Sequence, residues 1–556
     1  MAAASITVRP SPIEIARTAA AAMPAEVSTK PLLGILGVVT GAGVVTLTSR
    51  MISLGLPDFR GLHGFGYDES AWIGTAFDFG LMFIGPFTVY LGGLIGPRRI
   101  LLTAAALFTV LLIFLPLLHS YSLVIAMALM GGLTSGTFYP LTLTFALRNI
   151  PLRYLPFTLA WYATSVDGAV NIAPSLYGWY RDHLSSNWMF WNSALITPLM
   201  MICIYYGIPK TNPAKKSGKA PSFAGFVYAS AGLAMLLAAC EQGERLDWWR
   251  SGVFNALFVG GAFFLLCALV RRLRGPNPLV ALPYLLKWNT MLLGSLLFWF
   301  RFTLCTTIIL VPQALAIRGF EPDQIGPAII WSAVPLIPLA FTAALLLLRK
   351  FDSRLLMAIG LACTALAAWL NSQYGSTWAA ENFYRTELLT GMGQAFAFIG
   401  LVGCIVLQAI FAGALAKPEW VLTFSAFFHT IRIFGGTAGA IYMGHFLAQR
   451  EKLHSNLLGL HVNSGDWITH QNIHAMTAGL YAKSSGMAAA GARAIDLIAA
   501  RLRLQAYSLS LVDGFLLIAW SCACALIFVA LLRKSPFNYG ELSNMQQIPA
   551  THKESN

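Results

Sequence analysis

Apolar runs of about 20 residues, the length that crosses a bilayer as one α-helix, recur along almost the whole chain. The other fold that can span a membrane is the β-barrel, which needs shorter segments in which apolar and polar residues alternate. Here the runs are continuous and rich in Leu, Ala, Gly and Phe. The sequence therefore predicts an all-α polytopic membrane protein.

The composition agrees with this prediction. Only 11% of the residues are charged, whereas soluble domains carry about 25%. The net charge of +14 does not indicate a nucleic-acid partner, because the basic residues lie in short loops between apolar runs rather than in one patch. All eight cysteines fall inside apolar runs, so we expect neither a disulfide framework nor a zinc site.

We predict fourteen spans from the apolar runs. They cover about 31–53, 70–93, 98–117, 121–147, 157–178, 189–208, 222–240, 251–271, 289–312, 325–346, 352–370, 386–411, 418–447 and 509–532. Basic residues gather in alternate loops, and the loops between them hold mixed charge, including Glu241 and Glu387. This asymmetry predicts that both termini are cytoplasmic.

Polar segments divide the spans into parts. The predicted parts are an N-terminal cytoplasmic tail (1–30), a six-helix half (31–210), a cytoplasmic linker (211–222), an inserted two-helix hairpin (223–288), a second six-helix half (289–532) and a cytoplasmic tail (533–556). The second half contains a long outer loop (448–508) with an Ala-rich segment at helical spacing. Long loops with a helix of their own are more often functional than filler.

Several short motifs occur in a characteristic order: GLPDFRG, ESAWIGTAFDFGLMFIGP, GGLIGPRR, GGLTSGTFYPL, HTIRIFGGTAG, REKLHSN and VDGFLLIAW. In this order the chain resembles the fourteen-span drug:proton antiporters of the major facilitator superfamily, of the EmrB/QacA type. The resemblance implies two six-helix halves with spans 7 and 8 as a hairpin between them, and a substrate site near the membrane midplane. For the EmrB-like branch it also implies a periplasmic adaptor protein and an outer-membrane channel as partners, with the outer loop as the docking surface.

The chain departs from the family pattern at several positions. Thr48 stands where the family usually has Asp in span 1, and an apolar position near Ala128 stands where it has Arg. The turn GGLIGPRR lacks the usual acidic residue. The antiporter motif of span 5, Gly-Pro followed by two glycines, is half kept as Ala173, Pro174, Tyr177 and Gly178. These departures weaken the implied coupling mechanism but not the implied fold.

We single out six ionisable residues inside predicted spans as candidates for function, because a charge is costly there. They are Arg50, Asp78, Asp167, Arg301, His429 and Arg432. Asp167 lies near the middle of its span, and burial favours the protonated form of a carboxyl group. We therefore predict that Asp167 carries protons; the alternative is a structural Asp that bonds a neighbouring helix.

Asp78 and Arg432 are expected to meet across the seam between the halves. Such a pair would form in one conformation and break in the other. The alternatives are a static ion pair, or an Arg432 bonded to backbone carbonyl groups. His429 is predicted either to relay protons or to make a satisfied polar contact.

Arg301 and Arg50 are expected to face the central cavity, where spans 4, 9 and 12 show no carboxylate. Because Arg grips carboxylates with two hydrogen bonds, this predicts affinity for anionic amphiphiles. The alternative is that each Arg neutralises Asp78 or Asp167. In the outer loop, His470 and His474 lie one helical turn apart, but without a third ligand they do not predict a metal site.

The sequence thus predicts proton-coupled efflux of small amphipathic compounds, such as drugs or anionic aromatic or fatty-acid-like molecules. The expected location is the bacterial inner membrane, within a tripartite system. Two alternatives stay open: an importer, uniporter or exchanger of an organic anion with the same fold, and a membrane receptor or scaffold that transports nothing. An enzyme, a cofactor and a nucleic-acid partner are not predicted, because the chain has no nucleotide-binding loop and no nucleophile motif.

Overall fold

The computed structural model describes residues 30–141, 150, 154–210, 223–274, 281–411, 418–462, 465–535 and 538–541. Most of both predicted tails and the predicted linker at 211–222 lie outside the described residues. All regular elements among the described residues are helices, and eleven of these helices are long and apolar enough to cross a membrane. The predicted all-α membrane architecture is confirmed.

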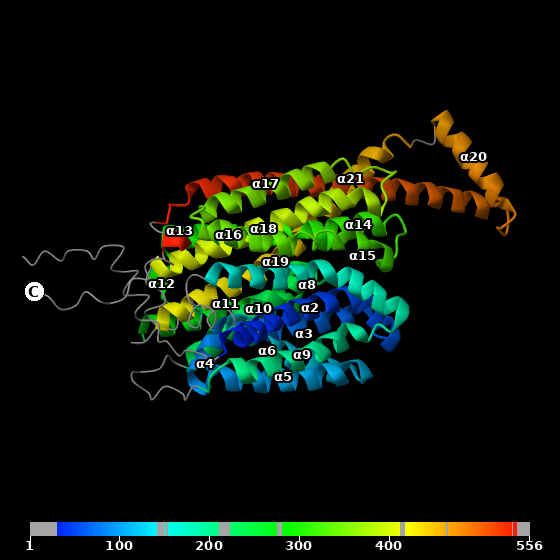
Figure 1. Cartoon of the computed structure of the whole chain (residues 1–556). Helices are drawn as coiled ribbons and strands as arrows, with labels where there is room; N and C mark the ends of the chain where they lie inside the picture. The colour runs from blue at the N-terminus through cyan, green and yellow to red at the C-terminus, as the bar shows by residue number, and fades with distance from the viewer. Residues whose placement is uncertain are drawn as a thin grey trace, which may run out of the picture.

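The first group of spans packs as one bundle (Figure 1). It contains α2 (Pro31–His63), α3 (Tyr67–Ile84), η1 (Gly85–Phe87), α4 (Thr88–Ile95), α5 (Pro97–Phe114), η2 (Leu115–Leu117), α6 (Tyr121–Ser135), α8 (Leu155–His183) and α9 (Trp188–Gly207). Small residues allow close approach of these helices. A Cβ atom on Gly132 of α6 would overlap the Phe77 carbonyl oxygen of α3, so these two helices touch backbone to backbone.

The second bundle contains interrupted spans. Its elements are α12 (Leu282–Leu285), α13 (Trp288–Thr303), the π-helical turn η5 (Thr306–Leu310), α14 (Val311–Ala316), α15 (Pro322–Ile330), α16 (Leu336–Leu348), α17 (Ser353–Asn371), α18 (Ala380–Phe411), α19 (Pro418–Gly459) and α21 (Met487–Leu531). The span predicted at 289–312 is broken by η5, and the one at 325–346 is broken between α15 and α16. π-Helical turns are frequent at functional sites.

The helical hairpin lies between the bundles. α10 (Phe223–Gly243) packs against both α3 and α19, while η4 (Trp248–Arg250) leads into α11 (Gly252–Arg274), which packs on α10. At the far end of α10, Arg245 donates to Asp68 of α3 at 2.6 Å, and Glu244 lies 3.2 Å from His445 of α19. The hairpin is therefore tied to both bundles by charged side chains as well as by packing.

The predicted count of fourteen spans is not confirmed. Three predicted spans, at α8, at α15–α16 and at α19, are not among the eleven helices that meet the criteria of length and apolarity. α8 contains Asp167, α19 contains His429 and Arg432, and the third is interrupted. Buried ionisable groups lower the apolarity of a helix, and a break shortens it, so hydropathy is a weak guide at these positions.

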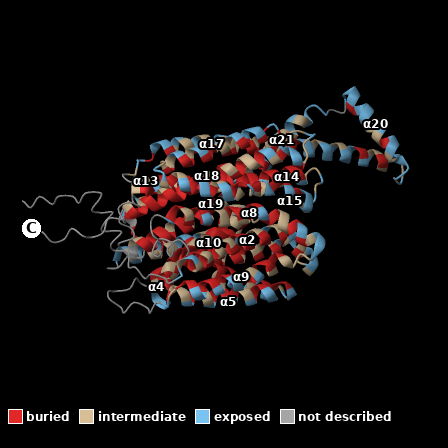
Figure 2. Ribbon diagram, viewed as in Figure 1, coloured by how far each residue is buried: buried red, intermediate tan, exposed pale blue. Residues whose placement is uncertain are grey.

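The predicted outer loop at 448–508 is largely helical. α19 continues to Gly459, α20 (Trp467–Tyr481) follows, and α21 begins at Met487 and runs unbroken into the last predicted span. We call residues 448–508 the appendage, because they project from one end of the bundle and are mostly exposed (Figures 1 and 2). The rings of His470 and His474 lie 4.5 Å apart on α20, and no cluster of three metal-ligating residues occurs within the described ranges.

A charged contact holds the base of the appendage. Arg450 Nε donates to Asp513 Oδ2 at 2.6 Å, and His454 Nε2 lies 2.7 Å from the same oxygen. Both partners of Asp513 belong to α19, so this residue links the two helices that leave the membrane region. Asp513 lies inside a predicted span, and the sequence analysis did not single it out.

Replacing Asp513 by Asn is expected to loosen the appendage, because hydrogen bonds to charged groups contribute about 1.5–3 kcal/mol each. Backbone amides of residues 448–508 should exchange hydrogen faster, by about one order of magnitude, as measured by mass spectrometry. The matched control is Asp496→Asn, which changes an exposed carboxylate of the same helix and should leave exchange unaltered. Equal exchange in the two variants would show that Asp513 does not secure the base.

Candidate functional site

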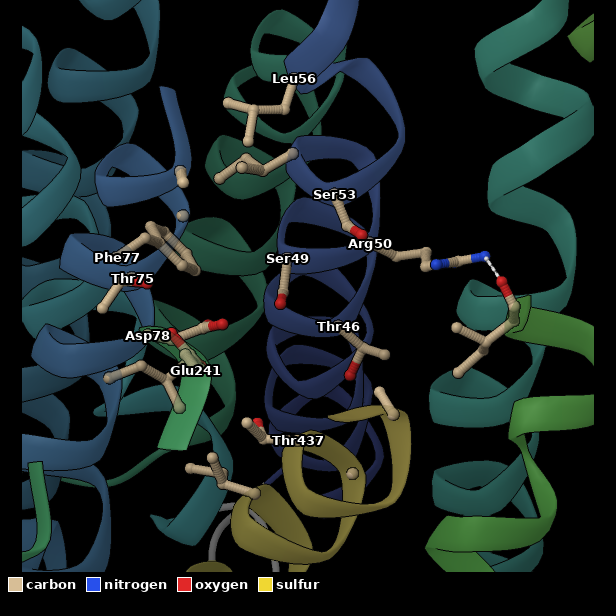
Figure 3. Close-up of a pocket in the computed structure, with 18 of the residues that line it drawn as sticks. Thr46, Ser49, Arg50, Ser53, Leu56, Thr75, Phe77, Asp78, Glu241 and Thr437 are labelled. Carbon is tan, nitrogen blue, oxygen red and sulfur yellow. Dashed lines mark hydrogen bonds between the residues drawn. The ribbon is translucent and has the colours of Figure 1, made fainter. Parts of the chain in front are cut away.

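A cavity of about 650 Å³ lies where the two bundles and α10 meet (Figure 3). Side chains of α2, α3, α10, α13 and α19 form most of its wall, and Val170 of α8 and Ile308 of η5 complete it. Pockets for drug-sized ligands have volumes of about 300–1,000 Å³. The cavity is therefore large enough for a small amphipathic molecule.

Four of the six ionisable residues predicted inside spans line this cavity: Arg50, Asp78, Arg301 and Arg432. The other two lie behind its wall. Asp167 is three residues from Val170 on α8, and His429 is three residues from Arg432 on α19, so each lies one helical turn from a lining residue. The structure thus gathers all six predicted residues around one region.

The partner of Asp78 is Glu241 of α10. The two carboxyl groups lie beside each other in the cavity wall, near Ser49 of α2 and Thr75 of α3 (Figure 3). Because two adjacent carboxylates repel each other, the pair favours keeping a proton on one of them. The predicted ion pair between Asp78 and Arg432 does not occur among the ion pairs of the described residues.

Two carboxyl residues correct the sequence interpretation. Glu241 was placed in an outer loop, but it lies inside α10 and lines the cavity. Glu387 was counted with a loop although it stands at the edge of the span predicted at 386–411; it lies inside α18, fully buried, with Ser332 at the α15–α16 break as its neighbour. The expectation that span 12 carries no carboxylate is therefore wrong. Each Glu ends or begins an apolar run, and hydropathy alone assigns such a residue to the loop.

Arg50 is held by an irregularity of the second bundle. Its Nη2 donates to the Ile308 carbonyl oxygen at 3.1 Å, and Figure 3 shows the side chain reaching away from Asp78 toward that oxygen. The α-helical donor for this carbonyl would be the N–H of residue 312, which is Pro312 and has none. The proline therefore cannot supply the usual α-helical donor to this carbonyl, and Arg50 supplies one.

Arg301 and Arg432 form the other part of the basic wall. The Arg432 guanidinium lies over the Tyr139 ring, 3.1 Å from its centre, and the side chain is only 6% exposed. Its Nε and Nη1 atoms, and Nε of Arg301, have no hydrogen-bond partner within the described part of the chain. Gly436 makes room for Arg301, since a Cβ atom there would lie 3.2 Å from Nη2.

Asp167 and His429 are buried without partners of their own. Asp167 is 1% exposed, His429 is 2% exposed, and neither side chain makes a hydrogen bond to any described group. The nearest charges to Asp167 are those of Arg301 and Arg432. His429 packs against Gly85, where a Cβ atom would overlap its Nε2. The alternative interpretation of His429 as a satisfied polar contact therefore has no support in the described contacts.

The half-kept antiporter motif lies where α8 meets α15. Tyr177 donates to Asp58 of α2. A Cβ atom on Gly178 would lie 2.8 Å from Asp323 Cα, so α8 and α15 touch through their backbones here. Ala173 and Pro174 are buried in α8, which continues through the proline. The motif thus forms part of the seam between the two bundles, away from the charged residues of the cavity.

Two bundles of membrane-length helices around a cavity lined by several charged side chains are an architecture found in many secondary transporters. The family model described as Major Facilitator Superfamily matches residues 38–440. The chain belongs to this superfamily, as its motifs suggested.

Several relatives carry names of drug export or drug resistance. Multidrug export protein EmrB of Haemophilus influenzae is 22% identical over 77% of this chain and 83% of its own length. The probable multidrug resistance protein EmrY of Escherichia coli K12 is 24% identical over 74% of this chain and 79% of its own length. Multidrug export protein EmrB of Escherichia coli K12 is 22% identical, over 89% and 93%. The resemblance to EmrB-type proteins is thereby confirmed.

Two solved structures show the same fold. The proton:xylose symporter XylE, bound to 6-bromo-6-deoxy-D-glucose, aligns with a TM-score of 0.55 at 10% identity, over 93% of this chain and 99% of that chain. The human organic anion transporter MFSD10 aligns with a TM-score of 0.50 at 13% identity, over 88% and 99%. At such identities these likenesses concern the fold alone.

Proposed function

We propose that this chain exports small amphipathic compounds from the bacterial cytoplasm or inner membrane, in exchange for protons. The observation that carries the proposal is the single cavity that holds a carboxyl pair on one wall and three arginines on another. Its volume suits drug-sized molecules, and the curated relatives are multidrug export proteins.

Proton coupling requires groups that change protonation as the two bundles move. The proposed groups are Asp78 with Glu241, which share a proton, and Asp167 and His429 behind the wall. Proton loss from the Asp78–Glu241 pair places negative charge in the cavity, and a cationic substrate group would compete with that proton for the same site. Such competition is what converts a proton gradient into export.

The appendage is the proposed docking surface for a periplasmic adaptor protein, with an outer-membrane channel completing a tripartite system. Its support is that α20 and the start of α21 project beyond the bundle and expose large apolar residues such as Trp467, Ile468 and Met487. The proposed orientation in the membrane places the appendage in the periplasm and both termini in the cytoplasm.

A second candidate function is import, uniport or exchange of an organic anion. Three of the four cavity arginines, Arg50, Arg301 and Arg432, favour it, because none of these three has a carboxylate ion-pair partner among the described residues. A receptor or scaffold that transports nothing is disfavoured, since it would not need buried charges around a cavity.

The test uses the purified protein in liposomes with a pH-sensitive dye inside. Addition of a candidate amphiphile should drive proton movement that protein-free liposomes lack. Substrate movement without proton movement would contradict the proposed exchange and favour the uniporter. Absence of any substrate movement across a panel of cationic and anionic amphiphiles would favour the receptor or scaffold.

A further inference from the structure

The basic wall of the cavity carries more positive charge than its described neighbours neutralise. Arg301 and Arg432 line the cavity together, where their like charges repel each other. Arg432 is more than nine-tenths buried, and two of its three nitrogen atoms lack a hydrogen-bond partner among the described groups. Buried guanidinium groups in this state favour an anion with several acceptor atoms.

One carboxyl group lies close enough to act on these arginines electrostatically. Asp167 interacts with the charges of Arg301 and Arg432, yet it forms no direct ion pair with either among the described contacts. Asp167 is behind the wall, and the adjacent Val170 lines the cavity. The carboxylate therefore offsets the arginines without occupying the space in front of them.

The remaining groups around Asp167 do not replace it. The hydroxyl groups of Tyr139 and Tyr162 also interact with the Asp167 charge, but they are neutral donors. On α19, His429 faces Arg432, and a proton on this ring would add positive charge there. On α2, Arg50 is bonded to a backbone carbonyl.

The elements packed on the rest of α8 add no nearer charge. On α18, Gln394 accepts from Asn171 at 2.7 Å, while Glu387 is directed to Ser332. On α15, Asp323 and Glu321 lie at the helix start, against Gly178 and Arg181. Among the described residues, Asp167 is therefore the one carboxyl group that acts on Arg301, while Asp78 and Glu241 also line the cavity.

We propose that Arg301 and Arg432 form a subsite for the acidic group of an amphipathic substrate, a carboxylate or a sulfonate, and that Asp167 is its internal counter-ion. With Asp167 ionised, the two arginines and Asp167 together carry a net charge of +1. With Asp167 protonated, they carry a net charge of +2. The substrate anion therefore binds together with a proton taken up by Asp167. This inference rests on the proposed function only in taking the cavity as the substrate site.

The consequence is that substrate binding affects proton binding in opposite directions at the acidic pair and at the basic subsite. A cationic group competes with the proton of the Asp78–Glu241 pair, whereas an anionic group recruits a proton at Asp167. By linkage, the effect is reciprocal: a lower pH strengthens anion binding as much as the anion strengthens proton binding. An anionic substrate thus crosses with its charge compensated.

The experiment measures equilibrium binding to the full-length protein in nanodiscs of neutral lipid, without any gradient. The probe is anilinonaphthalene sulfonate, a fluorescent amphiphile whose sulfonate stays charged throughout the pH range. The matched probe carries a quaternary ammonium group on a naphthalene body. For wild type, the Kd of the sulfonate should rise with pH, by up to about tenfold per pH unit.

Two variants separate the subsite from its counter-ion. Asp167→Asn should bind the sulfonate tightly at every pH, because the pair keeps its full charge. Arg301→Gln should bind it at least about tenfold more weakly than Asp167→Asn. In weakly buffered solution, wild type should take up close to one proton per sulfonate bound, and Asp167→Asn none. For the cationic probe, Asp167→Asn should change neither the pH dependence of binding nor the number of protons taken up.

Several results would overturn the inference. They are a sulfonate affinity of wild type that does not depend on pH, a pH dependence that persists in Asp167→Asn, or binding that is unchanged in Arg301→Gln. Proton uptake by wild type tests the linkage even if a variant fails to fold. If this linkage holds while liposomes show no proton-coupled transport, the proposed export fails and the anion subsite stands.

Discussion

An Asp78→Asn protein is expected to move substrate without moving protons. Asp78 lines the cavity beside Glu241, and we propose that the two carboxyl groups share a proton. The amide group of Asn cannot release a proton at physiological pH. In liposomes, the number of protons moved per substrate should fall by about one order of magnitude or more. Substrate should still cross down its own gradient, because the cavity and both bundles are unchanged.

The control for this experiment is Asp68→Asn. Asp68 is an exposed carboxylate on the same helix, where it accepts from Arg245, and its loss should leave coupling at the wild-type value. Glu241→Gln should reproduce the uncoupling of Asp78→Asn, because the two groups share one proton. Full coupling in Asp78→Asn, with loss of coupling in Asp167→Asn, would transfer the coupling role to Asp167.

A Gly178→Ala protein is expected to lose most of its transport while remaining folded. The new Cβ atom would meet the Asp323 backbone at 2.8 Å, and backbone cannot yield as a flexible side chain does. Overpacking of this kind costs about 1–3 kcal/mol, which shifts a two-state equilibrium by about 5- to 150-fold. Conformations in which α8 and α15 are closely packed should therefore become rare.

The matched control lies ten residues earlier on the same helix. A Cβ atom on Gly168 would meet nothing within 4 Å, so Gly168→Ala should transport normally. The conformational shift is measured as the labelling rate of a cysteine introduced by Ser53→Cys, a cavity position. Equal labelling and transport in the two alanine variants would show that the α8–α15 seam does not limit the cycle.

The sequence predicted the membrane architecture, the superfamily and the residues that gather around the cavity. These features follow from strong patterns: long apolar runs, and charges such as Asp167 that are too costly to bury without a role. The half-kept motif around Gly178 was also recognisable, although its contact with Asp323 was not, because the contact joins residues far apart in the chain.

Other features of the site depend on geometry that hydropathy does not carry. Glu241 and Glu387 stand at the edges of apolar runs, where a buried carboxyl and a solvated one look alike in sequence. The partner of Asp78 could not be predicted for the same reason. The Arg50 contact depends on Pro312. A proline in a helix has no N–H, and this signal could have indicated that the Ile308 carbonyl lacks its α-helical donor.

The unbroken course of α21 has a mechanical consequence. Its 45 residues give a rod about 68 Å long at about 1.5 Å per residue, and a hydrocarbon core occupies only about 30 Å of it. A tilt of about ten degrees within the membrane would therefore displace the free end by about 6 Å, since roughly 35 Å of helix projects beyond the core. A small tilt of α21 in the membrane would therefore become a larger displacement at its exposed end, where a bound partner would be moved with it.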